Sequence, residues 1–246
     1  MSGELKRDYE IGEEIGRGRF GVVHRCTSRA TGEAFAVKSV DRSQLADDLD
    51  RELAELEPKL AQLAAAGNPG VVQVHAVYED DVWTHMVMDL CSGPDLLDWI
   101  RLRRGAPVPE PLAAAVLAQL ADALAHCHRR GVAHRDVKPD NILLDVVAGG
   151  EYGEKADVWS AGVVLYVLLS GGALPFGGET AAEVLASVLR GSVRFPPRLF
   201  AGVSPAAKDL MRRMMCRDTW KRFSAEQVLA HPWIVSGGAR AMEQPT

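Results

Sequence analysis

Three polar residues that lie close together in the chain have the chemistry of a phosphate-handling loop. Asp136, Lys138 and Asn141 follow the dipeptide His134-Arg135. A carboxylate can accept a proton from a hydroxyl group, an ammonium group can hold phosphate oxygens, and an amide oxygen can bind a metal ion. The residue types and their spacing therefore predict a loop that brings a hydroxyl group, a phosphate and a metal ion together.

A glycine-rich turn near the N-terminus could hold phosphates with its backbone. Gly16, Gly18 and Gly21 form the pattern G-x-G-x-x-G. In a dinucleotide-binding turn, a helix follows these glycines directly. Here the residues that follow, 22–26, favour a strand, so the pattern indicates a hairpin that closes over phosphates. An ordinary glycine-rich hairpin without a ligand is the simpler alternative, and this pattern alone does not separate the two.

A lysine in an apolar strand-like stretch completes the set. Lys38 would need an anionic partner if it faces the interior, since an unpaired buried charge is very costly. The next predicted helix offers Glu52, Glu55 and Glu57. Glycine turn, strand lysine, helix glutamate and polar loop thus occur in a fixed order, and this order is far more specific than any one of the four motifs.

The elements that must position these residues fall into two halves. Residues 9–40 alternate and are rich in β-branched side chains, which predicts strands with a turn at Thr31-Gly32. Residues 43–66 predict a helix, and 71–90 predict two more strands with a turn at 79–81. From Asp95 onward helices predominate, one of them over residues 110–130.

Later helices carry start signals of their own. Thr180 with Glu183 and Ser224 with Gln227 have the spacing of capping boxes, and Ser204 before a proline fits an N-cap. The stretch 158–169 is the longest apolar one, and it is too short to cross a bilayer. It predicts a helix that is buried on all sides.

The amino-acid composition and the net charge limit the classes of function that the chain can have. The 246 residues are 47% hydrophobic and 25% charged, with a net charge of −5, so they can bury a real core. The negative charge argues against non-specific binding to nucleic acid or to an anionic membrane. The first residues lack an apolar core and residue 2 is not glycine, so neither a secretory signal nor a myristoylation signal is expected. Four scattered cysteines suggest reduced thiols in a cytoplasmic protein.

Together these motifs resemble those of the protein kinases, and the resemblance covers nearly the whole chain. It implies an α+β, bilobal fold, with a small β-rich N-lobe over residues 1–88, a hinge over 89–94 and a larger α-helical C-lobe over 95–246. It also implies that ATP and Mg²⁺ are the cofactors, with ATP bound between the lobes.

The resemblance assigns roles in nucleotide binding. Lys38 matches the lysine that holds the α- and β-phosphates, and Glu57 is the best match for its helix partner. Glu52 and Glu55 are then charges on a solvated face, and Met88 matches the residue at the back of the adenine pocket. The remaining nucleotide contacts that the resemblance implies are Ile15, Gly16, Gly18, Gly21, Val23, Ala36, Asp89, Cys91 and Asp95.

In the polar loop, the resemblance makes Asp136 the acceptor of the substrate's hydroxyl proton. Lys138 would contact the γ-phosphate and points to Ser/Thr rather than Tyr specificity, and Asn141 would hold a metal ion. Asp157 matches the family's buried aspartate that braces this loop.

Landmarks near the C-terminus narrow the resemblance. Residues 171–176, 222–223 and 231–234 resemble the calcium/calmodulin-dependent kinase group. Residues 194–196 and 204–209 are most similar to the plant phosphoenolpyruvate carboxylase kinases. This resemblance implies that the protein substrate is phosphoenolpyruvate carboxylase and that the kinase is a monomer. No D-x-D-x-D-G calcium loop occurs in the chain, which agrees with the resemblance because the phosphoenolpyruvate carboxylase kinases also lack such loops.

One part of the kinase pattern is absent. After Asn141-Ile-Leu-Leu-Asp the family continues into D-F-G, an activation loop and A-P-E, but here Asp145 leads directly into Val146, which resembles the sequence after A-P-E. The activation segment is therefore predicted to be missing between 145 and 146. Without the A-P-E glutamate, Arg222 would also lack its usual partner, and we expect a destabilising buried charge unless Glu151, Glu154 or water reaches it.

Three functions remain open at this point: a Ser/Thr kinase impaired by the missing segment, a catalytically dead pseudokinase that binds a nucleotide or a protein, and a defective product of splicing or of a gene model. Two further clusters have simpler structural explanations. Arg101, Arg103 and Arg104 fit a solvated helix end, and His126 and His128 fit a helix C-terminus rather than a metal site.

Overall fold

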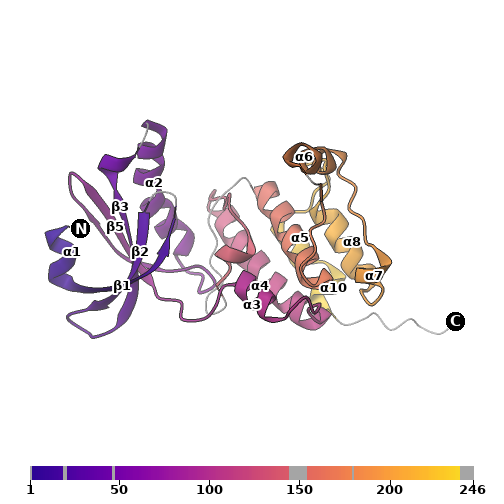
Figure 1. Cartoon of the computed structure of the whole chain (residues 1–246), viewed down its shortest axis with the longest axis horizontal. Helices are drawn as coiled ribbons and strands as arrows, with labels where there is room; N and C mark the ends of the chain where they lie inside the picture. Colours follow the sequence, from indigo (N-terminus) through magenta and orange to yellow (C-terminus); the bar gives the residue numbers. More distant parts are fainter. Residues whose placement is uncertain (1, 19–20, 46–47, 144–153, 179, 239–246) are drawn as a thin grey trace. The chain divides into compact units, whose positions relative to one another are not determined.

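The computed structural model describes residues 2–18, 21–45, 48–143, 154–178 and 180–238. They divide into two compact units, Met1–Gly93 and Pro94–Thr246. The boundary between them falls inside the segment 89–94, where the sequence predicts a hinge. Figure 1 labels most strands and helices of the two units.

Unit 1 is built on one antiparallel sheet with the strand order β1-β2-β3-β5-β4. Its strands are β1 (Tyr9–Arg17), β2 (Gly21–Ser28), β3 (Ala34–Asp41), β4 (Val74–Glu79) and β5 (Trp83–Asp89). The predicted β-rich first half is confirmed, including both turns. Gly32 takes a φ of 74° between β2 and β3, a conformation that glycine adopts without strain. Asp80 Oδ1 accepts the N–H groups of Val82 and Trp83 in the turn before β5.

A helix covers each face of this sheet (Figure 1). α1 (Gly3–Asp8) buries Leu5 against Cys26, Val37 and Val87 on one face. On the other face α2 (Asp48–Ala65) places Ala54 against Val40 of β3. Apolar residues of the sheet are therefore buried on both faces, and α2 packs on the face that includes Val40, and hence Lys38 two residues before it.

The helix predicted over 43–66 is interrupted near its start. Arg42–Gln44 forms a short 3₁₀ turn, and α2 begins at Asp48. The Asp41 carboxylate accepts the Ser43 N–H at 3.0 Å and its hydroxyl at 2.6 Å, which satisfies the turn locally and separates it from the helix.

Unit 2 is helical in its regular elements. Its longer helices are α4 (Glu110–Arg129), α5 (Glu154–Ser170), α6 (Ala181–Arg190) and α8 (Pro205–Met214). Shorter ones are α3 (Leu96–Leu102), the 3₁₀ turn η2 (Pro139–Asn141), α7 (Pro197–Phe200), α9 (Ala225–Leu229) and α10 (Pro232–Val235). The predicted predominance of helices after Asp95 is confirmed.

The core of unit 2 forms around α5. Val158, Val164, Leu165 and Leu168 of this helix are buried among residues of α4 and α8, which confirms the predicted buried helix. Gly162 permits the close approach of α5 to α8, because a Cβ at this position would lie 2.9 Å from the side chain of Met214. Figure 1 shows α4, α5 and α8 within this unit.

The predicted helix starts are also confirmed. Thr180 with Glu183 caps α6 and Ser224 with Gln227 caps α9 as complete capping boxes. Ser204 Oγ accepts the Ala207 N–H at the start of α8. Among the helices that the structure describes, none is both long and apolar enough to cross a membrane.

Candidate active site

The polar loop of unit 2 brings its three predicted residues into contact. Lys138 Nζ lies 2.8 Å from Asp136 Oδ2, and Asn141 Nδ2 donates to the same oxygen at 2.7 Å. The Asn141 amide also donates to the Asp136 backbone oxygen at 2.8 Å. The Asp136 carboxylate is thus oriented by an ammonium group and an amide while its side chain remains more than half exposed. The contact with Asp136 raises the pKa of Lys138.

Local backbone bonds shape this loop. Pro139 starts the 3₁₀ turn η2, and the Asn141 N–H donates to the Lys138 carbonyl at 3.0 Å. Just beyond the turn, Leu96 of α3 donates its N–H to the Ile142 carbonyl at 2.8 Å. Buried Ile142 anchors the end of the loop in the core of unit 2. The loop is therefore held at both ends of the turn by the rest of the unit.

The side chain of Asp157 holds the start of the polar loop, at His134 and Arg135, by hydrogen bonds. This carboxylate is 1% exposed, and it accepts the N–H groups of His134 at 2.9 Å and Arg135 at 3.1 Å. Its Oδ2 also lies 2.8 Å from His128 Nε2. The predicted bracing role is confirmed. Arg135 has a φ of 69°, a conformation that costs energy for a residue with a side chain, and the bond to Asp157 helps to hold it there.

Burial keeps the histidine of this loop neutral. The pKa of His134 is lowered to about 3, first because burial penalises the charged imidazole and second because of His128. Its Nδ1 accepts the Asp136 N–H at 2.9 Å, so the other ring nitrogen carries the proton. Burial also raises the pKa of Asp157, although the bonds from His128 and His134 oppose that shift. A neutral His134 thus positions the backbone of Asp136.

In unit 1, the strand register gathers predicted nucleotide contacts on one face of the sheet. Val23 lies opposite both Gly16 and Lys38, and Ala36 lies opposite Met88. Residues that are opposite each other in antiparallel strands project to the same face, as do residues two apart in one strand. The positions of all five residues are therefore on the face that carries Lys38.

Lys38 has an anionic partner, as its setting requires. Its ammonium group contacts a carboxylate oxygen of Glu57 on α2, and both side chains are partly buried. Glu55 instead pairs with Arg42 at 3.2 Å, and Glu52 is exposed. Of the three glutamates that the sequence offers, Glu57 is therefore the one that reaches the strand lysine.

Close packing explains one glycine of the turn. A Cβ on Gly21 would lie 2.4 Å from the Ser39 carbonyl oxygen, so a side chain at this position would displace β3. Gly18 donates its N–H to the Gly21 carbonyl at 2.9 Å and closes the turn. Residues 19–20 at its tip lie outside the described residues. Ile15, just before the turn, is exposed at the end of β1.

The remaining predicted nucleotide contacts already have bonds of their own. Asp89 donates its N–H to the Gln73 carbonyl, and its carboxylate contacts His75 at 2.7 Å. Asp95 caps α3 by accepting the Asp98 N–H at 2.7 Å. Cys91 is partly buried. Nothing in these contacts assigns a ligand to the three residues.

Comparison with known proteins identifies the family. The protein kinase domain matches residues 9–149 and 145–234 of this chain. This chain belongs to the protein kinase family. Calcium-dependent protein kinase 33 of Arabidopsis thaliana is 34% identical over 279 aligned positions, which cover 98% of this chain and 53% of that protein. Calcium-dependent protein kinase 14 of Oryza sativa subsp. japonica is 36% identical over 272 positions, which cover 96% of this chain and 51% of that protein.

The kinase fold is thus established, and the chain spans about half the length of these relatives. The predicted α+β kinase architecture is confirmed by the family match and by the five-stranded sheet of unit 1. The relatives are calcium-dependent protein kinases of plants, which agrees with the predicted calcium/calmodulin-dependent group.

The described residues of this kinase chain do not make a complete magnesium site. Mg²⁺ prefers octahedral oxygen coordination with at least one carboxylate. Asn141 can offer one amide oxygen, because its nitrogen bonds to Asp136. The Asp136 carboxylate is already engaged by Lys138 and Asn141. Asp145, Glu151 and the junction between 145 and 146 lie outside the described residues, as does the side chain of Glu154.

Arg222 finds partners other than the expected glutamate. Its Nε donates to the Cys216 carbonyl at 2.8 Å and its Nη1 to the Lys155 carbonyl at 2.7 Å. The guanidinium also lies over the Trp159 ring, 4.9 Å from its centroid. Burial lowers the pKa of Arg222. Two of its donors thus bond to neutral carbonyls, contacts that the sequence did not predict, whereas Glu151 and the side chain of Glu154 lie outside the described residues.

Sequence reasoning missed part of the support around Asp136. His128 was assigned a helix-end role, but it contacts Asp157 directly. The two residues are 29 positions apart in the chain, which gives no local signal, and the packing of α4 against α5 brings them together. The described residues contain no group of three His, Cys, Asp or Glu side chains that could hold a metal ion.

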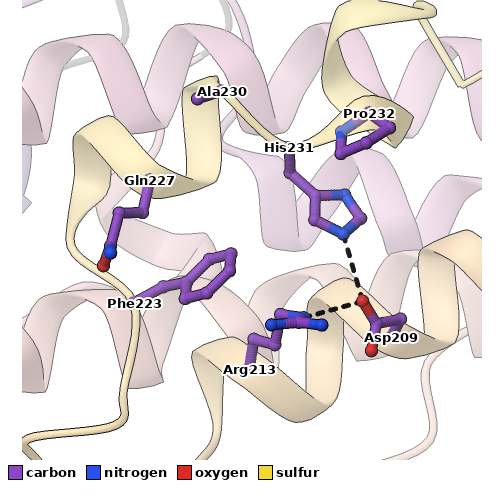
Figure 2. A pocket seen from close by; sticks show the side chains of 7 residues that line it. All are labelled: Asp209, Arg213, Phe223, Gln227, Ala230, His231 and Pro232. Atoms are coloured by element: carbon purple, nitrogen blue, oxygen red, sulfur yellow. Dashed lines mark hydrogen bonds and ion pairs between the residues drawn. The ribbon is translucent and has the colours of Figure 1, made fainter.

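A shallow groove lies elsewhere in unit 2. Figure 2 shows it between α8 and the segment from Phe223 to Pro232, with a volume of about 400 Å³. Asp209 bridges Arg213 at 2.7 Å and His231 at 3.3 Å along its wall. The opposite charges of Asp209 and Arg213 therefore largely cancel each other. None of the residues of the polar loop lines the groove.

Proposed function

We propose that this chain carries the parts of a protein serine/threonine kinase that transfers the γ-phosphate of ATP to a protein hydroxyl group. One observation carries the proposal: the Asp136 carboxylate is oriented between Lys138 and Asn141, on a loop that Asp157 anchors. Membership of the kinase family and the similarity to calcium-dependent protein kinases support it.

Each side chain has a distinct chemical task under this proposal. Asp136 accepts the proton of the substrate's hydroxyl group, and its exposed carboxylate leaves room for that contact. The Lys138 ammonium stabilises negative charge that develops on the transferred phosphoryl group. Lys38, held by Glu57, offers a second cation for the other phosphates of ATP. Asn141 would offer one amide oxygen to Mg²⁺, and the ion would supply neutralisation of the phosphate charge.

We further propose that the activation segment is absent from this chain. The kinase domain matches in two stretches that meet at residues 145–149, where the sequence predicts the junction. The alignment with calcium-dependent protein kinase 33 has 279 positions, 33 more than the 246 residues of this chain, so at least that many positions face a gap here. As it stands, the chain then lacks the D-F-G carboxylate and transfers phosphate poorly.

A pseudokinase that only binds a nucleotide is the second candidate. The observation in its favour is that the Lys38–Glu57 pair is formed although no D-F-G sequence occurs in the chain. The two candidates differ in what restoration of the segment would achieve. An impaired kinase would recover activity, whereas a pseudokinase would not.

The experiment compares three forms of the protein side by side. A family-like segment from D-F-G to A-P-E is inserted between Asp145 and Val146, and peptide phosphorylation is measured for the chain as it stands, the restored chain and the restored chain with Asp136→Asn. We expect restoration to raise the rate by about three orders of magnitude or more, the scale of electrostatic effects in phosphoryl transfer. Asp136→Asn should abolish the gain without loss of ATP binding.

Two results would contradict this proposal. Equal rates for the chain as it stands and the restored chain would mean that another carboxylate completes the metal site. An inactive restored chain that still folds and binds ATP would favour the pseudokinase.

The substrate is a separate proposal. Phosphoenolpyruvate carboxylase is the first protein to test, on the strength of the sequence resemblance. Asp140 is exposed beside the catalytic loop, and Asp95 is partly buried, so peptides with basic residues before the target Ser or Thr should be preferred. A peptide array with the restored chain would check this. Equal rates for peptides with and without arginine or lysine would disprove the preference.

A further inference from the structure

A strongly basic stretch lies in unit 2 of this otherwise acidic chain. Between Arg190 and Arg222 the sequence has nine arginines and lysines but only two acidic residues, Asp209 and Asp218. The whole chain has a net charge of −5. The basic charges are therefore concentrated here, and the catalytic chemistry does not use them.

Four arginines of this stretch form one arginine patch, defined as Arg190, Arg194, Arg212 and Arg217. The turn at Gly191 packs on Arg217, because a Cβ at Gly191 would lie 3.0 Å from the Arg217 Cβ. The guanidinium of Arg212 lies over the ring of Phe195, 4.8 Å from its centroid. Phe195 directly follows Arg194 in the chain. Gly191 thus lies beside Arg217 and Phe195 beside Arg212, so the segment 190–195 is close to the last turn of α8 and to the residues that follow it.

The arginine patch lacks internal compensation. All four side chains are exposed, and within the described part of the chain none of them forms an ion pair. The acids nearby are already used, since Asp209 pairs with Arg213 at 2.7 Å and Asp218 with Lys221 at 3.5 Å. Four guanidinium groups with open donors suit carboxylates, which arginine binds in bidentate geometry.

Large apolar side chains are exposed beside these charges. Leu185 and Leu189 lie one turn apart on α6, next to Arg190, and both are more than half exposed. Trp220 is 95% exposed three residues after Arg217. Tryptophan and arginine are the residue types that contribute most to protein–protein binding energy. The surface therefore combines charged and apolar anchors.

We propose that the arginine patch with Leu185, Leu189 and Trp220 is a docking surface for an acidic segment of a protein partner that also carries large apolar side chains. The negative net charge of the chain opposes a long-range approach to membranes or nucleic acids, which are extended polyanions. A short acidic segment is affected mainly by charges within about 10 Å, the screening length in solution, and so senses the local arginines.

Binding of designed peptides to the full chain tests this surface. The probes are labelled peptides of repeated Glu-Glu-Leu triplets and of repeated Gln-Gln-Leu triplets, measured by fluorescence anisotropy at low and moderate salt. Only the Glu-Glu-Leu peptide should bind, and more salt should weaken it. Arg194→Glu with Arg217→Glu should weaken binding about tenfold or more. Leu185→Ser with Leu189→Ser should weaken it several-fold.

The matched control changes net charge equally at a distance. Arg7→Glu with Arg101→Glu alters two exposed arginines outside the patch, and it should change the affinity about twofold or less. Near-ultraviolet circular dichroism checks that every variant keeps the fold. The proposal is overturned if the control loses as much affinity as the patch variant, if the Gln-Gln-Leu peptide binds equally, or if no Glu-Glu-Leu peptide binds. Binding to phosphatidylserine vesicles in its place would assign the surface to membranes.

Discussion

At the scale of single residues, the polar loop around Asp136 depends on buried side chains whose hydrogen bonds are almost all formed. Asp157 holds two backbone N–H groups and His128, while His134 holds the Asp136 N–H. These bonds are made away from water, where the loss of one partner leaves the others unsatisfied. The position of the exposed Asp136 carboxylate therefore depends on buried groups that cannot themselves contact a substrate.

Replacement of Asp157 by alanine should destabilise unit 2 by about 3–5 kcal/mol, because the loop N–H groups and His128 would lose a buried anionic partner. Urea unfolding monitored by circular dichroism measures the change. Asp157→Asn keeps one acceptor oxygen and should cost less than the alanine variant. Equal stability of Asp157→Ala and the unchanged chain would show that the anchor is not needed for folding.

His85 predicts a pH dependence in unit 1. It is 0% exposed, accepts the Ser2 N–H at 3.0 Å and donates to Ser39 Oγ at 2.8 Å. Burial lowers its pKa from 6.5 to about 4. Between pH 6.5 and pH 4, His85 is protonated in the unfolded chain but remains neutral in the folded chain. The folded chain therefore loses stability relative to the unfolded chain as the pH falls from 6.5 toward 4. The loss amounts to about 3 kcal/mol.

The test compares the unchanged chain with His85→Phe at pH 7 and pH 4.5. At pH 7 the variant should be less stable, by about 1–3 kcal/mol, because Ser2 and Ser39 lose a partner. At pH 4.5 the difference should shrink or reverse, because phenylalanine does not titrate. His134, whose pKa is also lowered, contributes equally to both proteins. Parallel pH curves would refute the role of His85.

At the scale of elements, one carboxylate ties three helices of unit 2 together. Glu110 at the start of α4 accepts the Ser204 N–H and hydroxyl, each at 2.7 Å, and the Trp233 indole N–H at 2.6 Å. Ser204 caps α8, and Trp233 is a fully buried residue of α10. The N-terminus of α4 thus positions the ends of two helices that are about 90 to 120 residues distant in sequence.

Glu110→Ala should therefore lower the stability of unit 2 by about 3 kcal/mol, since hydrogen bonds to a charged acceptor are the stronger ones. Hydrogen exchange should quicken at the start of α8 and around Trp233. Glu110→Gln keeps one acceptor oxygen and should lose roughly half as much. Unchanged exchange in α8 after Glu110→Ala would argue against this tie.

At the scale of the whole molecule, each unit carries its own part of the proposed kinase site. Unit 1 holds the Lys38–Glu57 pair and the glycine turn, and unit 2 holds Asp136 with its supports. The contacts of Lys38 form within unit 1 alone. We therefore expect the Lys38–Glu57 pair to form whether or not the chain has an activation segment.

We accordingly expect the chain to bind ATP or ADP weakly, with little dependence on magnesium, because the D-F-G carboxylate is absent from the sequence. Calorimetry with and without Mg²⁺ measures both properties. Lys38→Ala should weaken binding about tenfold through the lost charge-assisted contacts. Lys59→Ala, an exposed lysine of the same unit, serves as the matched control. Strong binding that requires magnesium would mean that another carboxylate has replaced the missing one.

The sequence by itself determined the motifs, most of the elements and the family resemblance. Alternating apolar residues in strands, capping boxes and the glycine turn are local patterns, and local patterns are set by neighbours within a few residues. For this reason the strands of unit 1, the buried helix α5 and the caps of α6, α8 and α9 were predictable. The roles proposed for Lys38 and Asp136 rest on the fixed order of the motifs along the chain and on the family resemblance.

Only the tertiary structure decided which distant groups meet. It paired His128 with Asp157 and Glu55 with Arg42, and it gave Arg222 two carbonyls and the Trp159 ring as partners. It also gathered Arg190, Arg194, Arg212 and Arg217, which lie on separate elements. Such contacts depend on how helices and strands pack, and packing follows from the shape and burial of whole elements, which no short stretch of sequence contains.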